Sequence, residues 1–204
     1  MDFQQGLITT IHEYGITKDL INELNKGLKN RPTAILIPCL YEEFERPALK
    51  SIKEVLKNLN GLNELVIALS AKSIEQVKSA KSFFESMPFP VHLQWTNSPS
   101  VIELLKSQEK NGLELLGTPG KGWAVWQGIG VATRKSEVVA LFDADIRTFS
   151  SLYPSKMILP LLDDSYGISY VKAFYSRLSL ETNELQGRAT RLFVGPLLDS
   201  LEQL

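Results

Sequence analysis

Cysteine and histidine are scarce in this sequence of 204 residues. Cys39 is the only cysteine, so no disulfide can form within the chain and no cysteine-based zinc site can be complete. His12 and His92 are the only histidines, which excludes the HExxH zinc motif and any multi-histidine metal site. We interpret both histidines as structural.

Long apolar runs and an excess of charge of either sign are also missing. No apolar run reaches the roughly 18 residues that a membrane-spanning helix needs, and the N-terminus lacks the basic and apolar pattern of a secretory signal. Lys and Arg together number 22 and Asp and Glu 23, giving a net charge of -1, which argues against a dedicated nucleic-acid binder. We therefore expect a cytoplasmic protein that binds neither nucleic acid nor a membrane.

The residues that are present have an ordinary globular composition, with 44% hydrophobic and 22% charged residues. Short apolar runs alternate with segments of helical spacing. Strands are expected at residues 33–38, 65–69, 91–95, 138–142 and 168–174. Helices are expected in a lead-in over residues 1–30 and at residues 43–59, 73–85, 101–110, 123–133, 153–162 and 188–204. Apolar strands separated by helices predict an α/β fold in one domain over 1–204, with a mostly parallel sheet and helices on both faces.

In such a sheet a ligand is expected beyond the carboxyl ends of the strands. Asp143 and Asp145 follow the predicted strand at 138–142. Carboxylates two residues apart in extended chain share a face, so they can converge on Mg²⁺ or Mn²⁺ bound to a diphosphate. The alternative is a solvated turn or a helix N-cap, since Asp-x-Asp is common by chance. The position after a buried strand favours the metal.

Two other turns are candidates for binding. In the loop GTPGKG (117–122), Lys121 lies between glycines and leads into a predicted helix, which suits close approach to an anion, although a plain loop with a solvated lysine fits equally well. The polar turn at 38–43 follows the first strand, where a base or ribose would lie. We interpret Cys39 in this turn as a small buried hydrophobe rather than a nucleophile. Trp123 and Trp126 are interpreted as core residues.

A fourth candidate opens the predicted last helix. The helix N-terminus, the Arg188 guanidinium and the Thr190 hydroxyl together describe a phosphate or carboxylate site, and a capped helix with surface arginines is the alternative. This helix is still apolar on one face where the sequence stops. We therefore expect either the N-terminal part of a longer enzyme or an oligomer, such as a homodimer, that covers this face.

Taken together, these segments resemble the glucosyl-3-phosphoglycerate synthases, which are retaining glycosyltransferases of family 81 with the GT-A nucleotide-diphospho-sugar transferase fold. The resemblance is greatest to the cyanobacterial type. The matching segments are MDFQQGLITTIHEYG, IPCLYEEFERPALKSI, LGTPGKGWAVWQG, LFDADIRTF, VKAFYSRLSLE and GRATRLFVGPLL. Because they occur in the same order along essentially the whole chain, the resemblance is more specific than any one motif.

The resemblance implies a metal-dependent enzyme that moves glucose from a nucleotide-glucose, commonly UDP-glucose, to D-3-phosphoglycerate. The product, glucosyl-3-phosphoglycerate, leads to the compatible solute glucosylglycerate. The implied metal ligand is Asp145, for Mg²⁺ or Mn²⁺, and no catalytic residue is assigned. The implied donor-binding residues are Pro38, Cys39, Leu40, Tyr41, Glu42, Ser70, Lys121, Asp143 and Ala144. The implied acceptor-binding residues are Gly187, Arg188, Ala189 and Thr190.

Two departures from the family pattern leave alternatives open. Tyr41 stands where the family usually has Asn, and the segment IALSAKS has fewer Asp and Gly residues than usual, so the preferred nucleobase stays open. A later family segment that supplies a metal-binding His is absent. The alternatives are a mannosyl transferase acting on 3-phosphoglycerate or glycerate, and a nucleotide-sugar-binding fragment without activity of its own.

Overall fold

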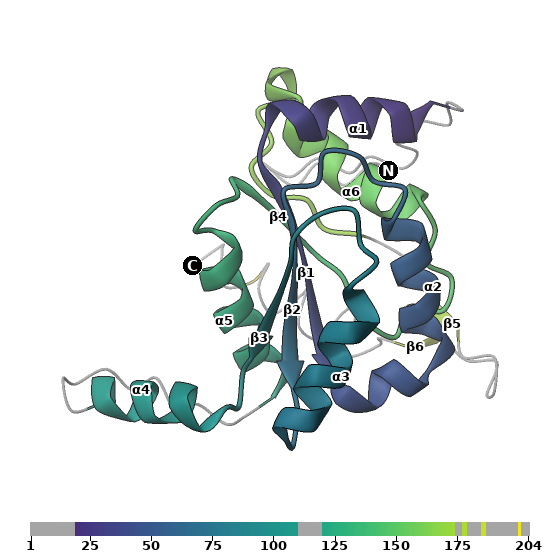
Figure 1. Cartoon of the computed structure of the whole chain (residues 1–204). Coiled ribbons are helices and arrows are strands. Elements are labelled where there is room, and N and C mark those ends of the chain that lie inside the picture. Colours follow the sequence, from purple (N-terminus) through teal and green to yellow (C-terminus); the bar gives the residue numbers. More distant parts are fainter. Residues whose placement is uncertain (1–18, 110–119, 174–176, 179–184, 187–199, 201–204) are drawn as a thin grey trace. The chain divides into compact units, whose positions relative to one another are not determined.

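The computed structural model describes residues 19–109, 120–173, 177–178, 185–186 and 200 (Figure 1). The chain divides into two compact units, 1–171 and 172–204. In the second unit, β5 (Arg177–Leu178) and β6 (Leu185–Gln186) pair in antiparallel orientation. The first unit contains α1 (Leu20–Asn30), β1 (Thr33–Leu40), η1 (Tyr41–Glu45), α2 (Pro47–Leu56), β2 (Glu64–Ser70), α3 (Ile74–Phe84), β3 (Val91–Trp95), α4 (Pro99–Glu109), α5 (Lys121–Ala132), β4 (Val138–Leu141), α6 (Leu152–Leu162) and η2 (Asp164–Tyr166).

Four of these strands form one sheet in the order β3-β2-β1-β4, and all of its pairs are parallel. Leu36 of β1 lies opposite Val66 of β2 on one side and Leu141 of β4 on the other. β1 and β2 are buried along almost their whole length, which explains why each is an unbroken apolar run in the sequence. The predicted parallel α/β sheet is confirmed.

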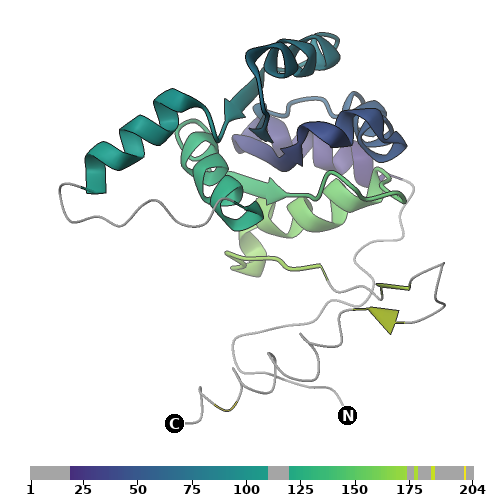
Figure 2. The ribbon, with the colours of Figure 1, turned by 90° about the horizontal axis from the view of Figure 1, so that it is seen from below.

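Helices cover both faces of the sheet, but unequally (Figure 1). The larger core lies on the face formed by Ile35, Ile37, Leu65 and Ile67, where α1, α2, α3 and α6 contribute leucine, isoleucine and phenylalanine. Among the described residues, the opposite face packs against α5. In both Figure 1 and Figure 2, α4 projects away from the end of β3.

The segment predicted as one helix at 43–59 is divided in two. A 3-10 turn, η1, ends at Glu45, and Arg46 is extended at φ -90° and ψ 150°. Pro47 is the cause, because a proline disfavours helical backbone in the residue before it and favours the first position of a new helix. The carboxyl end of β1 is therefore followed by a tight polar turn, and α2 begins only after it.

The strand predicted at 168–174 does not form over the residues that the structure describes there, 168–173. η2 ends at Tyr166, and Gly167, which caps it, has a left-handed backbone at φ 59°. Tyr170 is 78% exposed, so this segment lacks the burial that a central strand of a covered sheet requires. The predicted helix at 188–204 lies outside the described residues apart from Ser200.

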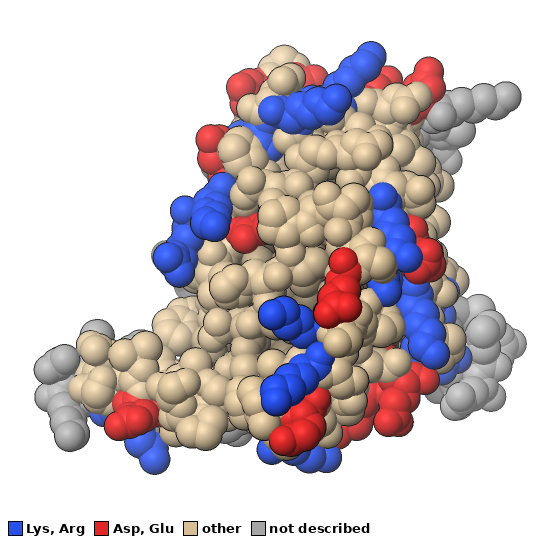
Figure 3. All heavy atoms as spheres, in the orientation of Figure 1, with Lys and Arg blue, Asp and Glu red and all other residues tan. Residues whose placement is uncertain are grey.

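None of the helices in the described ranges is both long and apolar enough to cross a membrane. On the face drawn in Figure 3, lysine and arginine alternate with aspartate and glutamate over the described surface. This face therefore shows no basic stripe of the kind that binds nucleic acid.

Candidate functional site

A cavity of about 420 Å³ lies at the carboxyl edge of the sheet. Residues at or just beyond the ends of all four strands contribute to its wall, together with the first turn of α5. Its lining residues are Pro38, Cys39, Leu40, Glu43, Ala68, Ser70, Thr96, Asn97, Gly120, Lys121, Trp123, Ala124, Asp143, Ala144 and Asp145. The cavity occupies the place where parallel α/β sheets bind ligands.

The structure brings most of the residues predicted for donor and metal binding to this cavity. They are Pro38, Cys39, Leu40, Ser70, Lys121, Asp143, Ala144 and Asp145. Strands that are distant in sequence but parallel end at the same edge, which explains why turns spread over more than 100 residues meet here. The predicted acceptor residues, 187–190, lie outside the described residues.

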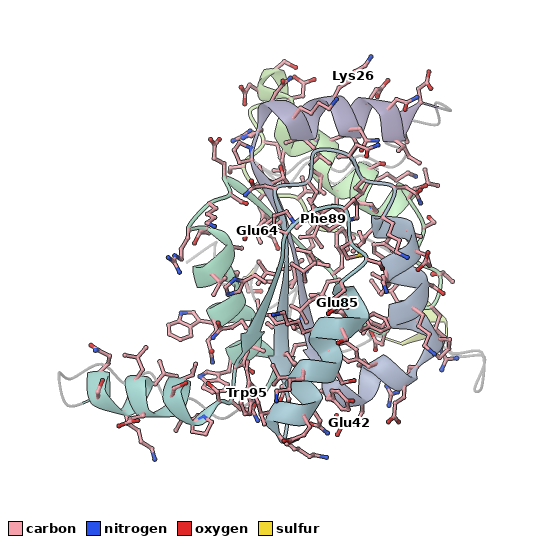
Figure 4. The ribbon with its side chains drawn as sticks, in the orientation of Figure 1. Lys26, Glu42, Glu64, Glu85, Phe89 and Trp95 are labelled. Carbon is pink, nitrogen blue, oxygen red and sulfur yellow. The ribbon has the colours of Figure 1, made fainter. Side chains whose placement is uncertain are left out.

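Tyr41 and Glu42 are not part of the cavity lining. Tyr41 stacks on Phe44, with ring centroids 5.6 Å apart. Glu42 is exposed and accepts a hydrogen bond from Lys72 Nζ at 2.9 Å, and this bond lowers the pKa of the Glu42 carboxyl. Figure 4 shows Glu42 and Trp95 near the edge where the strands end, with Glu64 toward the other end. A donor-binding role for Tyr41 and Glu42 stays a prediction.

A cation and a helix N-terminus meet at one side of the cavity. Lys121 is the first residue of α5, and Gly120 precedes it at the N-cap with no side chain to cap the helix. The first N–H groups of a helix have no partner inside it and carry partial positive charge. Lys121 Nζ donates to Asp143 Oδ1 at 2.5 Å, so Asp143 holds the lysine at the cavity. This arrangement suits an anion such as a phosphate.

The two aspartates of the DAD segment differ in surroundings. Asp143 is paired with Lys121, Ala144 is buried, and Asp145 is exposed to solvent at the cavity wall. Among the described residues, no group of three or more His, Cys, Asp and Glu side chains is arranged to hold a metal ion. Asp145 therefore fits a metal that takes its other ligands mainly from phosphate and water, as Mg²⁺ commonly does.

Several wall residues were missed by the sequence analysis, and those after β3 are the clearest. Thr96 Oγ1 donates to the Leu69 carbonyl at 3.1 Å. Asn97 accepts from the Ala71 N–H at 3.1 Å and donates to the Ala71 carbonyl at 3.0 Å. These bonds join the ends of β2 and β3. The available signal was the polar run Thr96-Asn97-Ser98 directly after an alternating strand.

Side-chain amides attach α5 to the same edge of the sheet. Gln127 Nε2 donates to the Thr96 carbonyl at 3.2 Å, and Gln127 Oε1 accepts from Gln94 Nε2 at 3.3 Å. Trp123, on the first turn of this helix, is half-buried at the cavity wall, whereas Trp126 is 50% exposed. The prediction that Trp126 packs in the core is therefore wrong, because that position of α5 faces away from the sheet.

Cys39 lies in the wall and is only 4% exposed. Burial raises the pKa of its thiol to about 12, and the nearby carboxylates of Glu43 and Glu42 add to the shift. The thiol therefore stays protonated at neutral pH. Because the thiolate is the reactive form of cysteine, this environment agrees with a buried apolar role and not with a nucleophile.

The sequence is similar to those of known proteins that are named for glucosyl transfer. The chain is 37% identical over 203 residues to the glucosyl-3-phosphoglycerate synthase of Methanococcoides burtonii, covering 99% of this chain and 50% of the relative. It is 31% identical over 203 residues to the enzyme of that name from Persephonella marina, covering 98% and 49%. The chain thus spans about half the length of these curated relatives, and it matches their N-terminal part. No family model matches the chain.

Solved structures of a protein with the same name also align with this chain. Glucosyl-3-phosphoglycerate synthase from Mycobacterium tuberculosis, in complex with Mn²⁺, UDP and phosphoglyceric acid, aligns with a TM-score of 0.60 and 25% identity over 95% of this chain and 56% of that one. The same enzyme with Mn²⁺ and UDP-glucose aligns with a TM-score of 0.60. The fold is therefore that of the GT-A glycosyltransferases. In sequence, the chain is similar to about half the length of the glucosyl-3-phosphoglycerate synthases.

Proposed function

We propose that this chain is the donor-binding part of a metal-dependent glucosyltransferase. The enzyme would move glucose from a nucleotide-glucose, first of all UDP-glucose, to D-3-phosphoglycerate. One observation carries the proposal: Lys121, Asp143 and Asp145 and the N-terminus of α5 converge on one cavity at the carboxyl edge of a GT-A sheet. The similarity to relatives of that activity supports it over the whole length of the chain.

Each charged group has a distinct role in the proposed reaction. Lys121 and the N-terminus of α5 would stabilise the negative charge that grows on the departing diphosphate, and Asp143 would keep Lys121 in position through its 2.5 Å ion pair. Asp145 would hold Mg²⁺ or Mn²⁺, which when bound neutralises part of the same charge. A site prepared in this way reorganises little during the reaction.

The nucleoside would lie against the turn after β1, where Pro38, Cys39 and Leu40 form the wall, with Ser70 at the end of β2. The acceptor would be bound by Gly187 to Thr190, and this part of the proposal rests on the sequence alone. Its test is Arg188→Ala. Loss of the guanidinium should raise the KM for 3-phosphoglycerate and leave nucleotide binding nearly unchanged. A fall in nucleotide affinity would contradict the assignment.

The proposal includes the domain organisation, the cellular location and the oligomeric state of the enzyme. Residues 1–204 would belong to a single catalytic domain, and the region corresponding to the second half of the relatives would complete it. The enzyme would act in the cytoplasm, where it would supply glucosyl-3-phosphoglycerate for compatible-solute synthesis. A homodimer is one way to cover the apolar face predicted for residues 188–204.

The test of the donor site is calorimetric titration of the 204-residue chain with UDP and UDP-glucose, with and without Mn²⁺. We expect Mn²⁺ to tighten binding. Asp145→Ala should remove that gain, about two orders of magnitude, because the carboxylate that anchors the metal is lost. Glu103→Ala is the matched control, since Glu103 is an exposed carboxylate on α4 outside the cavity lining.

Product analysis completes the test. The chain is incubated with UDP-glucose, 3-phosphoglycerate and Mn²⁺, and glucosyl-3-phosphoglycerate is sought by mass spectrometry. Product that disappears in Asp145→Ala and persists in Glu103→Ala would establish the enzyme. Binding without product would reduce the proposal to donor binding by this part, and no nucleotide binding at all would reject it.

A further inference from the structure

The helix α5 meets the sheet through its smallest side chains. Its buried positions are Ala124, Gly128 and Ala132. Such residues allow a close approach, but they present few atoms that interlock with the strands, so they resist sliding and rotation of the helix only weakly. Directional hydrogen bonds are the contacts that can fix the place of such a helix.

Gln127 supplies two such bonds, one from each end of its side-chain amide. Nε2 donates to the Thr96 carbonyl at 3.2 Å, and Oε1 accepts from Gln94 Nε2 at 3.3 Å. Thr96 is itself held firmly, because it is 1% exposed and both its N–H and its Oγ1 donate to the Leu69 carbonyl, at 2.9 and 3.1 Å. Gln127 thus joins α5 to the bonded ends of β2 and β3.

Within the described ranges, Lys121 is the other residue of α5 whose side chain forms a hydrogen bond outside the helix. Its Nζ lies 2.5 Å from Asp143 Oδ1, but its side chain is 59% exposed, and exposed ion pairs contribute little to holding a backbone in place. Lys121 precedes Gln127 by six residues, about 9 Å along the helix axis. Because a helix moves as a stiff unit over this length, a contact that fixes Gln127 also fixes the backbone of Lys121.

We propose that Gln127 is a positioning residue that holds α5, and with it Lys121, in the place needed to bind the diphosphate of the donor. The inference rests on the proposed function, in which Lys121 stabilises that diphosphate. Gln127 is not part of the cavity lining, so it would act through Lys121 and would touch neither the nucleotide nor the reacting atoms. A displacement of about 1 Å in a site can cost about a hundredfold in rate, and we expect a loss of about tenfold in nucleotide affinity.

The test is calorimetry on the full 204-residue chain with UDP. Gln127→Met removes both hydrogen bonds and keeps the length of the side chain and a similar helix propensity, and it should weaken UDP binding about tenfold. Thr133→Ala is the control, because Thr133 is exposed just after α5 and its Oγ1 donates to the Ile129 carbonyl of the same helix. It should bind UDP as the wild type does.

A double-mutant cycle distinguishes positioning of Lys121 from a merely structural role. Lys121→Ala should itself weaken UDP binding about tenfold or more, because a cation at the diphosphate is lost. Adding Gln127→Met to Lys121→Ala should then cost little, since no lysine is left to be misplaced. Equal losses with and without Lys121 would show that Gln127 acts independently of it, and would overturn the proposal.

A second variant keeps the proposal testable if Gln127→Met does not fold, which urea denaturation would show. Gln94→Ala removes only the bond to Gln127 Oε1 and leaves the bond to the Thr96 carbonyl. It should weaken UDP binding about threefold when Lys121 is present and have little effect in Lys121→Ala. An affinity equal to that of the wild type would contradict the positioning role.

Failure of this inference and failure of the proposed function give different results. Wild-type and Gln127→Met chains that bind UDP equally well would overturn the role of Gln127 and leave the proposed function intact. A Lys121→Ala chain that binds UDP as the wild type does would reject the inference together with the phosphate-binding role of Lys121. A wild-type chain that binds none of UDP, ADP and GDP would reject both the inference and the proposed function.

Discussion

The two faces of the central sheet are built from side chains of different size. One face presents Ile35, Ile37, Leu65 and Ile67 to a core that four helices complete. In the part of the chain that the structure describes, the other face presents Ala34, Leu36, Val66 and Ala68 to one helix, α5. The buried positions of this helix are Ala124, Gly128 and Ala132. The same strands supply both sets, because alternate residues point to opposite faces.

The two faces contribute differently to the protein: one mainly to stability, and the other to the geometry of the candidate site. Large side chains on the first face bury most of the apolar area and so provide most of the hydrophobic stabilisation. Small side chains on the second face let α5 approach the strands closely. Because α5 begins at Lys121, this close approach brings Lys121 Nζ to 2.5 Å from Asp143 Oδ1. The face with the smaller side chains is therefore the one that positions Lys121 against Asp143.

The largest expected effect tests the first face. Ile67 is fully buried there, so Ile67→Ala should lower the free energy of unfolding by about 3–4 kcal/mol through lost burial and a residual cavity. Val66→Ala, one residue away on the small face, should cost about half as much, because fewer carbons are removed. Urea denaturation measures both, and equal losses would contradict the unequal faces.

The next effect tests the close approach of α5. A Cβ added at Gly128 would overlap Leu36 Cδ1 and lie 3.3 Å from the Ala68 Cβ. Gly128→Ala should therefore destabilise the protein by about 1–3 kcal/mol, although alanine is the better helix former. It should also weaken UDP binding, because α5 carries Lys121. A more stable variant with unchanged UDP affinity would show that α5 is not closely packed.

A third effect concerns Cys39, which belongs to the large core. Its pKa is raised from 9.0 to about 12, so its neutral form stabilises the fold fully below pH 9, and this contribution is lost as the pH rises toward 12. At pH 10 the loss should reach about 1.4 kcal/mol. Cys39→Ala should flatten the decline between pH 9 and 11 in denaturation experiments. Parallel curves for the two proteins would refute the buried thiol.

The smallest effect is a matched control on the same helix, with the opposite sign. Nothing lies within 4 Å of a Cβ built at Gly130, and this residue is exposed. Gly130→Ala should raise stability by up to about 1 kcal/mol, because alanine loses less backbone entropy in a helix. The midpoint of thermal unfolding measures it. Destabilisation here would mean that alanine is unfavourable in α5 even where no atom is near, so the loss in Gly128→Ala would not measure close packing.

The elements with a purely local cause were predicted closely. β1 and β2 were predicted to within a few residues because buried parallel strands are unbroken apolar runs. The predicted strand at 168–174 was wrong over its described part. A strand in a covered sheet needs a neighbouring strand to pair with and a layer that buries it, and a local apolar pattern gives no information about either. Tyr170 is exposed there, and no sequence pattern indicated it.

The candidate site divides in the same way. Lys121, Asp143 and Asp145 were recognisable because each follows a strand or precedes a helix, which are general places for charged ligand-binding groups. Glu43 was predicted only as part of the polar turn at 38–43, Trp123 was interpreted as a core residue, and Asn97 was not recognised. Their position at the cavity depends on the turn after β1, on the rotation of α5 about its axis and on the pairing of β3 with β2. None of these is a local property.

The sequence by itself determined the order of strands and helices, the parallel sheet and the motifs at its carboxyl edge, since these depend on periodicity and on residue type at strand ends. Only the tertiary structure decided which carboxylate of the Glu42-Glu43 pair lines the cavity and that Lys121 pairs with Asp143. Both outcomes depend on close packing between segments far apart in the chain, where a shift of an ångström or a rotation of one helix would change the partners.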